Sequence, residues 1–150
     1  MLDFNRSNRV VCENMGEVRV KVKLINAVDE ILVNRGLLNP NQLRTYETEA
    51  LVDTGAVRTV LPRQIVEQLG LKIRGHQTAQ YADGREETIG LTEPVIIQLE
   101  GRETTEVTLV AGNEVLIGQT VLETLDLLVD CKNQCLIPNP KHPDYSVLRI

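Results

Sequence analysis

Aromatic residues are scarce in this sequence, which has no Trp, one Phe and three Tyr among its 150 residues. The apolar side chains are mainly Val, Leu and Ile, 48 in all, so the core of the folded chain must be aliphatic. Thr, Val and Ile are β-branched, and such side chains suit half-buried strands better than helices. A chain of this size buries roughly two thirds of its surface when it folds as one domain. The composition therefore predicts an all-β domain.

Long apolar runs are also missing, because no more than three apolar residues follow one another anywhere in the chain. A membrane-spanning helix needs about 20 such residues, and a signal-peptide core needs about 7–15. We therefore expect a soluble, cytoplasmic protein, and an odd number of cysteines fits a reducing compartment better than a disulfide framework. The net charge of −5 argues against nucleic acids and anionic membranes as partners.

The motifs of several hydrolase classes are absent. The two serines, Ser7 and Ser146, lie outside any Gly-x-Ser-x-Gly turn, and no His-Glu-x-x-His zinc motif occurs. A thiol enzyme would need one of the cysteines with a histidine partner, but no local motif joins them. Cys131 and Cys135 lack the partners of a zinc site, and we interpret them as small residues facing each other across a hairpin. No metal or other cofactor is expected.

Hydrophobic spacing and turn residues divide the chain into an N-terminal extension, residues 1–14, and one domain, residues 15–150. Apolar residues alternate with Arg and Lys over 18–24, a spacing typical of a strand with one wet face. Asp-Gly is a strong hairpin signal, because both central residues of a type I′ turn take positive φ. The predicted elements are strands 18–24, 44–52, 115–117 and 127–129, a long surface connection over 26–41, helices 62–69 and 119–125, and hairpins over 78–89 and 95–110.

The last third of the chain repeats the order of the middle. Residues 115–129 run as an apolar strand, a Gly, a short helix and a strand, as residues 50–71 do. This similarity predicts an internal duplication and a pseudo-twofold monomer. The second copy has no carboxylate at the position of Asp53, so one chain would supply only half of a carboxylate pair.

Asp53 is the acidic residue with the most informative position. It follows the apolar run Ala50-Leu51-Val52 and precedes Thr54 and Gly55. On the pattern alone a polar turn residue is favoured, because Asp-x-Gly is a common turn. A carboxylate at the end of a buried strand is nevertheless costly unless it is paired, and such placements mark functional sites.

Further motifs surround Asp53 in a particular order. They are Ala50–Ala56, Thr59–Pro62, Tyr81–Gly84, Val115–Gly118, Leu122–Asp130 and Leu136–Pro140. Asp-Thr-Gly-Ala alone is a weak signal, but here an apolar-apolar-Gly element follows about sixty residues later, with an Asp-Gly hairpin between them. From about Met15 to Pro140 the sequence resembles the retropepsin-like aspartic proteases, most closely the small stand-alone bacterial members of that clan.

The resemblance implies an all-β, retropepsin-like closed β-barrel with two short helices, a pseudo-twofold monomer and a homodimer. It implies an aspartic endopeptidase in which two Asp53 carboxylates share a proton and activate water against a peptide bond. Thr54 would lock the two active-site turns together, and Gly55 would permit close approach of backbone and substrate. The chain near Gly118 would form a second ψ-like loop. Residues implied in substrate binding are Ala56, the flap residues Ala82, Asp83 and Gly84, and Ile117 and Gly118.

Three positions depart from the viral members of this clan. Those usually carry acidic residues after Asp-Thr-Gly-Ala and Arg after the second-half Gly, where this chain has Val57, Arg58 and Gln119. The two losses agree with each other, because a buried charge left without its partner would destabilise the fold more than a neutral residue in its place. A non-catalytic homodimeric module that binds peptides or proteins stays open as an alternative. An aspartyl phosphotransferase is disfavoured, because Gly55 stands where its second acid is expected.

Overall fold

The computed structural model describes residues 2–3, 11–12, 17–148 and 150. Most of the predicted extension and its boundary at residue 15 lie outside the described residues. Within the extension, β1 (Leu2–Asp3) pairs antiparallel with β2 (Val11–Cys12). Among the helices of the described residues, none has the length and apolar character needed to cross a membrane.

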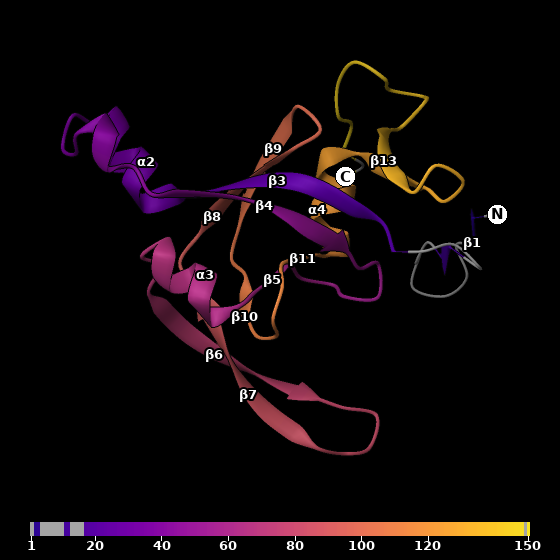
Figure 1. The fold of residues 1–150 in the computed structure, drawn as a ribbon, viewed down its shortest axis with the longest axis horizontal. Helices are drawn as coiled ribbons and strands as arrows, with labels where there is room; N and C mark the ends of the chain where they lie inside the picture. The colour runs from indigo at the N-terminus through magenta and orange to yellow at the C-terminus, as the bar shows by residue number, and fades with distance from the viewer. Residues whose placement is uncertain (1, 4–10, 13–16, 149) are drawn as a thin grey trace.

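A curled sheet of nine strands forms the body of the protein (Figure 1). The strand order is β6-β7-β10-β5-β11-β4-β3-β8-β9, in which the neighbours β10 and β5, and β11 and β4, run parallel. The strands are β3 (Arg19–Asn26), β4 (Thr45–Val52), β5 (Val60–Leu61), β6 (Ile73–Gln80), β7 (Glu86–Thr92), β8 (Val95–Leu99), β9 (Arg102–Glu106), β10 (Leu109–Val110) and β11 (Leu116–Ile117). The all-β prediction is confirmed.

The sheet is a half-barrel and not the closed barrel that the resemblance implies. Its first and last strands, β6 and β9, lie at opposite ends of the strand order and do not pair with each other within the described residues. The physical reason is the β6–β7 hairpin, which leaves the body of the domain and projects away from it in Figure 1. Because β6 points away from the body, it does not come alongside β9 at the other edge of the sheet.

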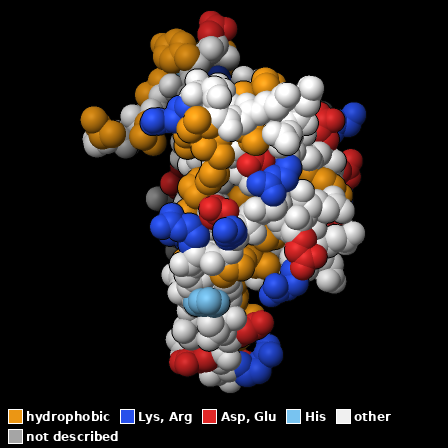
Figure 2. Space-filling model, turned by 90° about the vertical axis from the view of Figure 1, so that its left-hand side faces the viewer, with side chains coloured by type: hydrophobic (Ala, Val, Ile, Leu, Met, Phe, Trp, Pro, Cys, Tyr) orange, Lys and Arg blue, Asp and Glu red, His pale blue; other side chains and the backbone are white. Residues whose placement is uncertain are grey.

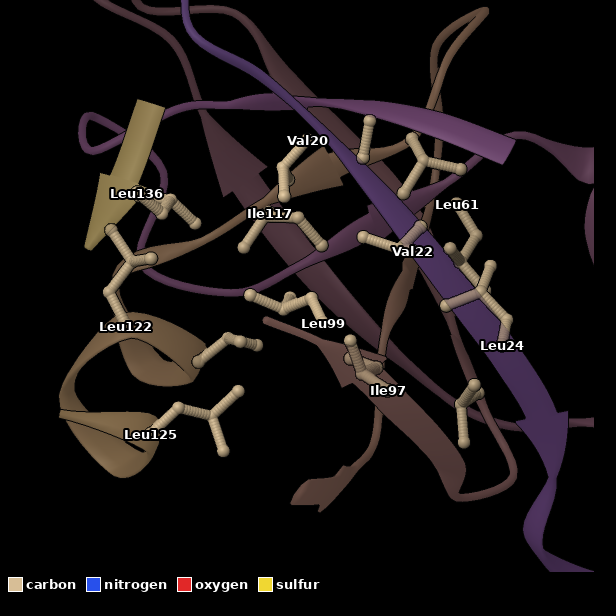
Figure 3. Close-up of a cluster of buried hydrophobic side chains, with 14 of the residues drawn as sticks. Val20, Val22, Leu24, Leu61, Ile97, Leu99, Ile117, Leu122, Leu125 and Leu136 are labelled. Carbon is tan, nitrogen blue, oxygen red and sulfur yellow. The ribbon is translucent and has the colours of Figure 1, made fainter. Parts of the chain in front are cut away.

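An aliphatic core lies on the inner face of this sheet, as the composition predicts. Val20, Val22 and Leu24 of β3 are buried and alternate with exposed or half-exposed Arg and Lys. Figure 3 shows them meeting side chains from β8, β11 and α4 (Gln119–Leu125). Burying one such side chain is worth about 1.5–3 kcal/mol, and a one-residue slip would turn the whole set outward. The alternation therefore fixes the register of β3.

Two predicted helices are confirmed: α3 (Arg63–Gln68) and α4. The predicted surface connection over 26–41 is wrong, because it contains α2 (Ala27–Asn34) and a 3-10 turn, η1 (Pro40–Gln42). Asn26 caps α2 by accepting the Asp29 N–H at 3.0 Å, and its buried amide donates to the Leu69 carbonyl at 2.8 Å. Arg44 donates to the buried Asp29 carboxylate at 2.8 Å. The Asn26 cap is local, and the contacts with Leu69 and Arg44 join the helix to distant parts of the chain.

Both predicted hairpins are confirmed, but their turns differ. Glu100 and Gly101 have φ of 49° and 73°, which gives the expected type I′ turn between β8 and β9. At the β6–β7 tip, Gly84 has φ of 88°, while Asp83 has no positive φ. Instead, the Tyr81 carbonyl accepts the Gly84 N–H at 3.0 Å, and the Tyr81 N–H donates to the Arg85 carbonyl at 2.8 Å. The type I′ expectation is wrong there, because a three-residue loop needs only its Gly in the left-handed region.

A separate two-stranded sheet, β12 (Leu127–Asp130) and β13 (Cys135–Pro138), follows α4. The linking residue Asp126 has φ of 55°, and its carboxylate accepts hydrogen bonds from Asn139 and His142. Cys131 lies in the turn between the two strands and is disulfide-bonded, whereas Cys135 is free. The expectation of reduced cysteines is therefore wrong for Cys131.

Candidate active site

A threaded strand holds the loop that carries Asp53. The chain leaves β4, forms the loop over residues 53–59 and returns as β5, and β11 inserts between these two strands. Leu116 of β11 pairs in parallel with Leu51 of β4 and antiparallel with Val60 of β5. The loop is thus closed around a strand that comes from about 60 residues further along the chain. The second ψ-like loop expected near Gly118 stays a prediction.

Asp53 sits at the mouth of this loop with its backbone fixed on both sides. Its N–H donates to the Ile117 carbonyl at 3.0 Å, and its own carbonyl accepts the Ala56 N–H at 3.1 Å. Its carboxylate Oδ1 accepts the Gly55 N–H at 2.9 Å. Asp53 and Thr54 are half-buried, so the carboxylate reaches solvent at one edge. This geometry holds one carboxylate oxygen in place and leaves the group able to meet a ligand.

The first turn of α4 closes the other side of the loop. Gln119 N–H donates to the Ala56 carbonyl at 2.8 Å, and Thr120 N–H donates to the Val57 carbonyl at 3.0 Å. The first N–H groups of a helix have no partner within the helix, so the loop carbonyls satisfy them. The helix and the loop therefore fix each other.

Thr59 and Gly118 form the tightest contact in the site. The buried Thr59 hydroxyl accepts the Gly118 N–H at 3.1 Å. A Cβ atom at Gly118 would lie 2.5 Å from the Arg58 carbonyl carbon and 2.8 Å from the Thr59 nitrogen. Only glycine allows the two backbones to approach so closely, because it has no Cβ.

The other predicted site residues fall into two groups. Ala56 and Gly118 border the Asp53 loop, and Ile117 does so through its carbonyl, because its side chain is fully buried in the core. Ala82, Asp83 and Gly84 form the exposed tip of the β6–β7 hairpin. In Figure 1 this tip and the loop after β4 extend toward the same side of the molecule, on the right.

The residues that replace the viral charge network lie at the edge of the same loop. Val57 is 67 % exposed and Arg58 is also exposed. The Gln119 amide donates to Glu123 at 3.3 Å, and its Oε1 is buried without a hydrogen-bond partner among the described residues. The sequence differs from the viral members of the clan at these three positions. Within the described ranges, none of the three takes part in an ion pair.

Sequence reasoning missed the contributions of Thr59, Tyr81 and Glu87. Thr59 begins the motif Thr59–Pro62, and the resemblance of that motif to the family was the only sequence signal that pointed to Thr59. The Tyr81 hydroxyl donates to the Glu87 carboxylate at 2.6 Å across the β6–β7 hairpin. No local pattern marks this pair, since it depends on the hairpin register. In the described part of the chain, no three His, Cys, Asp or Glu side chains gather as a metal site.

The threaded loop, the Asp-Thr-Gly turn and the projecting hairpin together define the retropepsin-like class of aspartyl protease folds. The model of one family in this class, described as gag-polyprotein putative aspartyl protease, matches residues 41–124, more than half of the chain. The chain belongs to this family. No curated protein matches the sequence. The matched range includes both the Asp53 loop and the hairpin over 73–92, which we call the flap.

Proposed function

We propose that the protein is a homodimeric aspartic endopeptidase that cleaves peptide bonds in extended polypeptide segments. The observation that carries this proposal is the Asp53 loop, in which a half-buried carboxylate is held by the Gly55 N–H and by a threaded strand. Membership of an aspartyl protease family supports the same chemistry. The partner is a second copy of this chain, and the substrate is a peptide or protein.

The chemistry requires two carboxylates in different protonation states. At close range two like charges cannot both persist, so a pair of Asp53 side chains would share one proton. The ionised carboxylate accepts a proton from a water molecule that attacks the scissile carbonyl carbon. The protonated one donates to the carbonyl oxygen, and the resulting tetrahedral species breaks its carbon–nitrogen bond as the amine takes a proton. No cofactor is needed for these steps.

Symmetry is the simplest way to supply the second carboxylate. The pseudo-equivalent segment, Leu116-Ile117-Gly118, has no acid, and Gly118 has no room for a side chain. Twofold dimers are the commonest closed assemblies. In such a dimer Thr54 would join the two loops, and Leu136-Ile137 and Val147-Leu148 are candidates for strands that pair across the axis.

The substrate would lie between the Asp53 loop and the flap. An extended peptide binds readily as an added strand, because its backbone groups then find partners on an open strand edge. Ala56, Gly118 and the Ile117 carbonyl would border this cleft from one side, and Ala82, Asp83 and Gly84 from the other. Activity should follow a bell-shaped curve on the acidic side of neutrality, whose two limbs belong to the carboxylate pair.

The decisive test is Asp53→Asn. Asn keeps the shape of the side chain but cannot exchange the proton, so we expect cleavage of denatured protein at acid pH to be lost while the fold and the dimer persist. Asp144→Asn, at an exposed aspartate of the C-terminal segment, is the matched control and should retain activity. Mixing wild type with an excess of Asp53→Asn subunits should inhibit activity, because heterodimers carry one acid.

Three outcomes would contradict the proposal. Turnover by purified Asp53→Asn would show that another residue carries the chemistry. Constant specific activity on dilution and on mixing, in a sample shown by ultracentrifugation to dissociate and exchange subunits, would show that a monomer suffices. Peptide binding by the wild type without any cleavage, with or without a peptidic aspartic-protease inhibitor, would favour the non-catalytic binding module instead.

A further inference from the structure

The flap has one open strand edge. β6 is the first strand in the order of the nine-stranded sheet, and within the described residues it pairs with β7 alone. Its residues from His76 to Gln80 are exposed, apart from the half-buried Ala79. An edge strand leaves a row of backbone N–H and C=O groups without partners, and another extended chain can pair with them. The free edge of β6 is therefore a candidate docking surface.

The hydrogen bonds at the tip of the hairpin show which backbone groups face this free edge. The Tyr81 N–H donates to the Arg85 carbonyl, so these two residues form a hydrogen-bonded pair. Hydrogen-bonded and non-hydrogen-bonded pairs alternate along an antiparallel ladder, and residues in the second kind of pair turn their backbone groups away from each other. Counted from Tyr81, the register places His76, Thr78 and Gln80 in the second kind. Their N–H and C=O groups point to the free edge, at the two-residue spacing that an added strand requires.

The features that normally protect an edge are confined to the foot of β6. Charged side chains, prolines and β-bulges discourage pairing with other chains. The register with β7 shifts between Ile73 and Gly75, which leaves Arg74 as the extra residue of a bulge. From Gly75 to Gln80 the strand has no Lys, Arg, Asp, Glu or Pro, and its register is regular. An extended segment can therefore pair with this outer part of β6.

The foot of β6 is basic, although the whole chain has a net charge of −5. Residues 68–82 contain two cations, Lys72 and Arg74, and no acid. Both are exposed, and neither forms an ion pair within the described residues. Glu93 accepts the Lys72 N–H at 2.9 Å, but it follows β7 and lies on that side of the hairpin. Figure 2 shows Lys and Arg side chains where the projecting lower part of the molecule joins the body. Two cations are thus available to a partner at one end of the free edge.

We propose that the free edge of β6 binds an extended, acidic segment of a partner protein as an added strand. The backbone of that segment hydrogen-bonds to His76, Thr78 and Gln80, and Asp or Glu side chains at one of its ends face Lys72 and Arg74. In such complexes the backbone pairing gives affinity and the side chains give selectivity. This inference goes beyond the proposed function, because it uses neither the Asp53 carboxylate nor a cleaved bond.

The first experiment measures charge selectivity. Fluorescein-labelled peptides carry six alternating Thr and Val residues and a terminal pair of Glu, Gln or Lys. One set has the pair at the N-terminus and one at the C-terminus, because an added strand can run in either direction. They are titrated into Asp53→Asn protein, which also lacks the proposed cleavage activity. Two exposed ion pairs predict that in one set the Glu peptide binds about 5-fold more tightly than the Gln peptide.

Charge variants locate the source of this selectivity. Lys72→Gln combined with Arg74→Gln should make the affinities for the Glu and Gln peptides equal. The matched control is Lys141→Gln, at an exposed lysine of the C-terminal segment, and it should leave the 5-fold difference intact.

A proline tests the backbone part of the site. Thr78 and Thr88 face each other across the hairpin, and both are exposed. The Thr78 N–H points to the free edge of β6, whereas the Thr88 N–H points to the opposite edge of the hairpin, where β10 pairs only with Gly90 and Leu91. Thr78→Pro removes a donor from the proposed site and should weaken peptide binding about 10-fold. Thr88→Pro removes the equivalent donor from the other edge and should leave binding unchanged.

Hydrogen exchange measured by NMR tests the site without any substitution at the edge. The amides of His76, Thr78 and Gln80 point away from β7, so they should exchange rapidly in the free protein. A saturating amount of the Glu peptide should slow all three about 10-fold or more, because they become hydrogen-bonded. The Thr88 amide is the internal control and should stay fast.

Each outcome bears on the proposal. If wild type cleaves nothing but the Glu peptide binds through β6, the proposed enzyme activity fails and the docking site is supported. Equal affinities for the Glu and Lys peptides, no binding by any peptide, or equal effects of Thr78→Pro and Thr88→Pro overturn it. Slow exchange of the Thr78 amide without peptide, increasing with protein concentration, shows that a second copy of the chain occupies the edge and also overturns it.

Discussion

The Asp53 loop and the flap lie on one side of the molecule but are held in opposite ways. Backbone hydrogen bonds from β11 and from the first turn of α4 fix the loop, and a buried hydroxyl joins Thr59 to Gly118. The flap beyond Ile89 is held by its own two strands, because β10 pairs with β7 only at Gly90 and Leu91. Residues 81–88 are all exposed.

This difference shows how one fold can combine rigidity with adaptation. A carboxylate that must exchange protons needs a fixed position, since small displacements of a reacting group cost much of the rate. In the proposed enzyme the flap would admit and release a peptide, and a segment with few buried contacts opens at low free-energy cost. We therefore expect substitutions in the loop to change stability, and substitutions in the flap to change substrate choice.

The sharpest comparison is between two glycines, one in each region. In Gly118→Ala the added methyl group would meet the Arg58 backbone, and we expect a loss of about 3 kcal/mol, as for overpacking of a close backbone contact. Gly84→Ala, at φ of 88° in open space, should cost about 1–2 kcal/mol, which is the price of left-handed backbone alone. Urea unfolding monitored by circular dichroism measures both. A larger loss of unfolding free energy in Gly84→Ala than in Gly118→Ala would contradict the expectation that the loop is the more tightly packed region.

The second test removes one hydroxyl from the loop. Thr59→Val keeps the side-chain shape but leaves the buried Gly118 N–H without its acceptor, so we expect a loss of about 1–3 kcal/mol. Thr59→Ser keeps the hydroxyl and removes a methyl group, which should cost about 0.8 kcal/mol. If Thr59→Ser proved the more harmful of the two, packing and not the hydrogen bond would hold the loop.

The smallest expected effect concerns pH at the flap tip. The backbone N–H and the guanidinium of Arg85 lower the pKa of Asp83 below its ordinary value. A lowered pKa means that the contact stabilises the turn above the ordinary Asp pKa, and that this contribution is lost as pH falls through the lowered value. Carboxyl NMR titration of wild type should show the lowered pKa, and Arg85→Gln should raise it. An unchanged Asp83 pKa in that variant would show that the backbone N–H of residue 85, and not the Arg85 guanidinium, lowers it.

Much of this architecture follows from the sequence because its causes are local. The alternation over 18–24, the Pro and Gly that bracket α3, and the Asp-Gly and Glu-Gly turns each act within a few residues of one another. The position of Asp53 after an apolar strand and the spacing of its motifs also sufficed to identify the candidate catalytic residue and the family-like pattern. The residue roles proposed for Thr54 and Gly55 remain predictions from that pattern.

Other features were decided only by the tertiary structure. Helix α2 begins at a local cap, in which Asn26 accepts the Asp29 N–H, but the contacts of Asn26 with Leu69 and of Asp29 with Arg44 join it to distant segments, and these could not be predicted from the sequence. The open half-barrel results from the direction in which the flap leaves the sheet, and the pairing of Tyr81 with Glu87 results from the hairpin register. Local sequence sets backbone preferences over a few residues, but the partner of a buried polar group is set by the packing of distant segments.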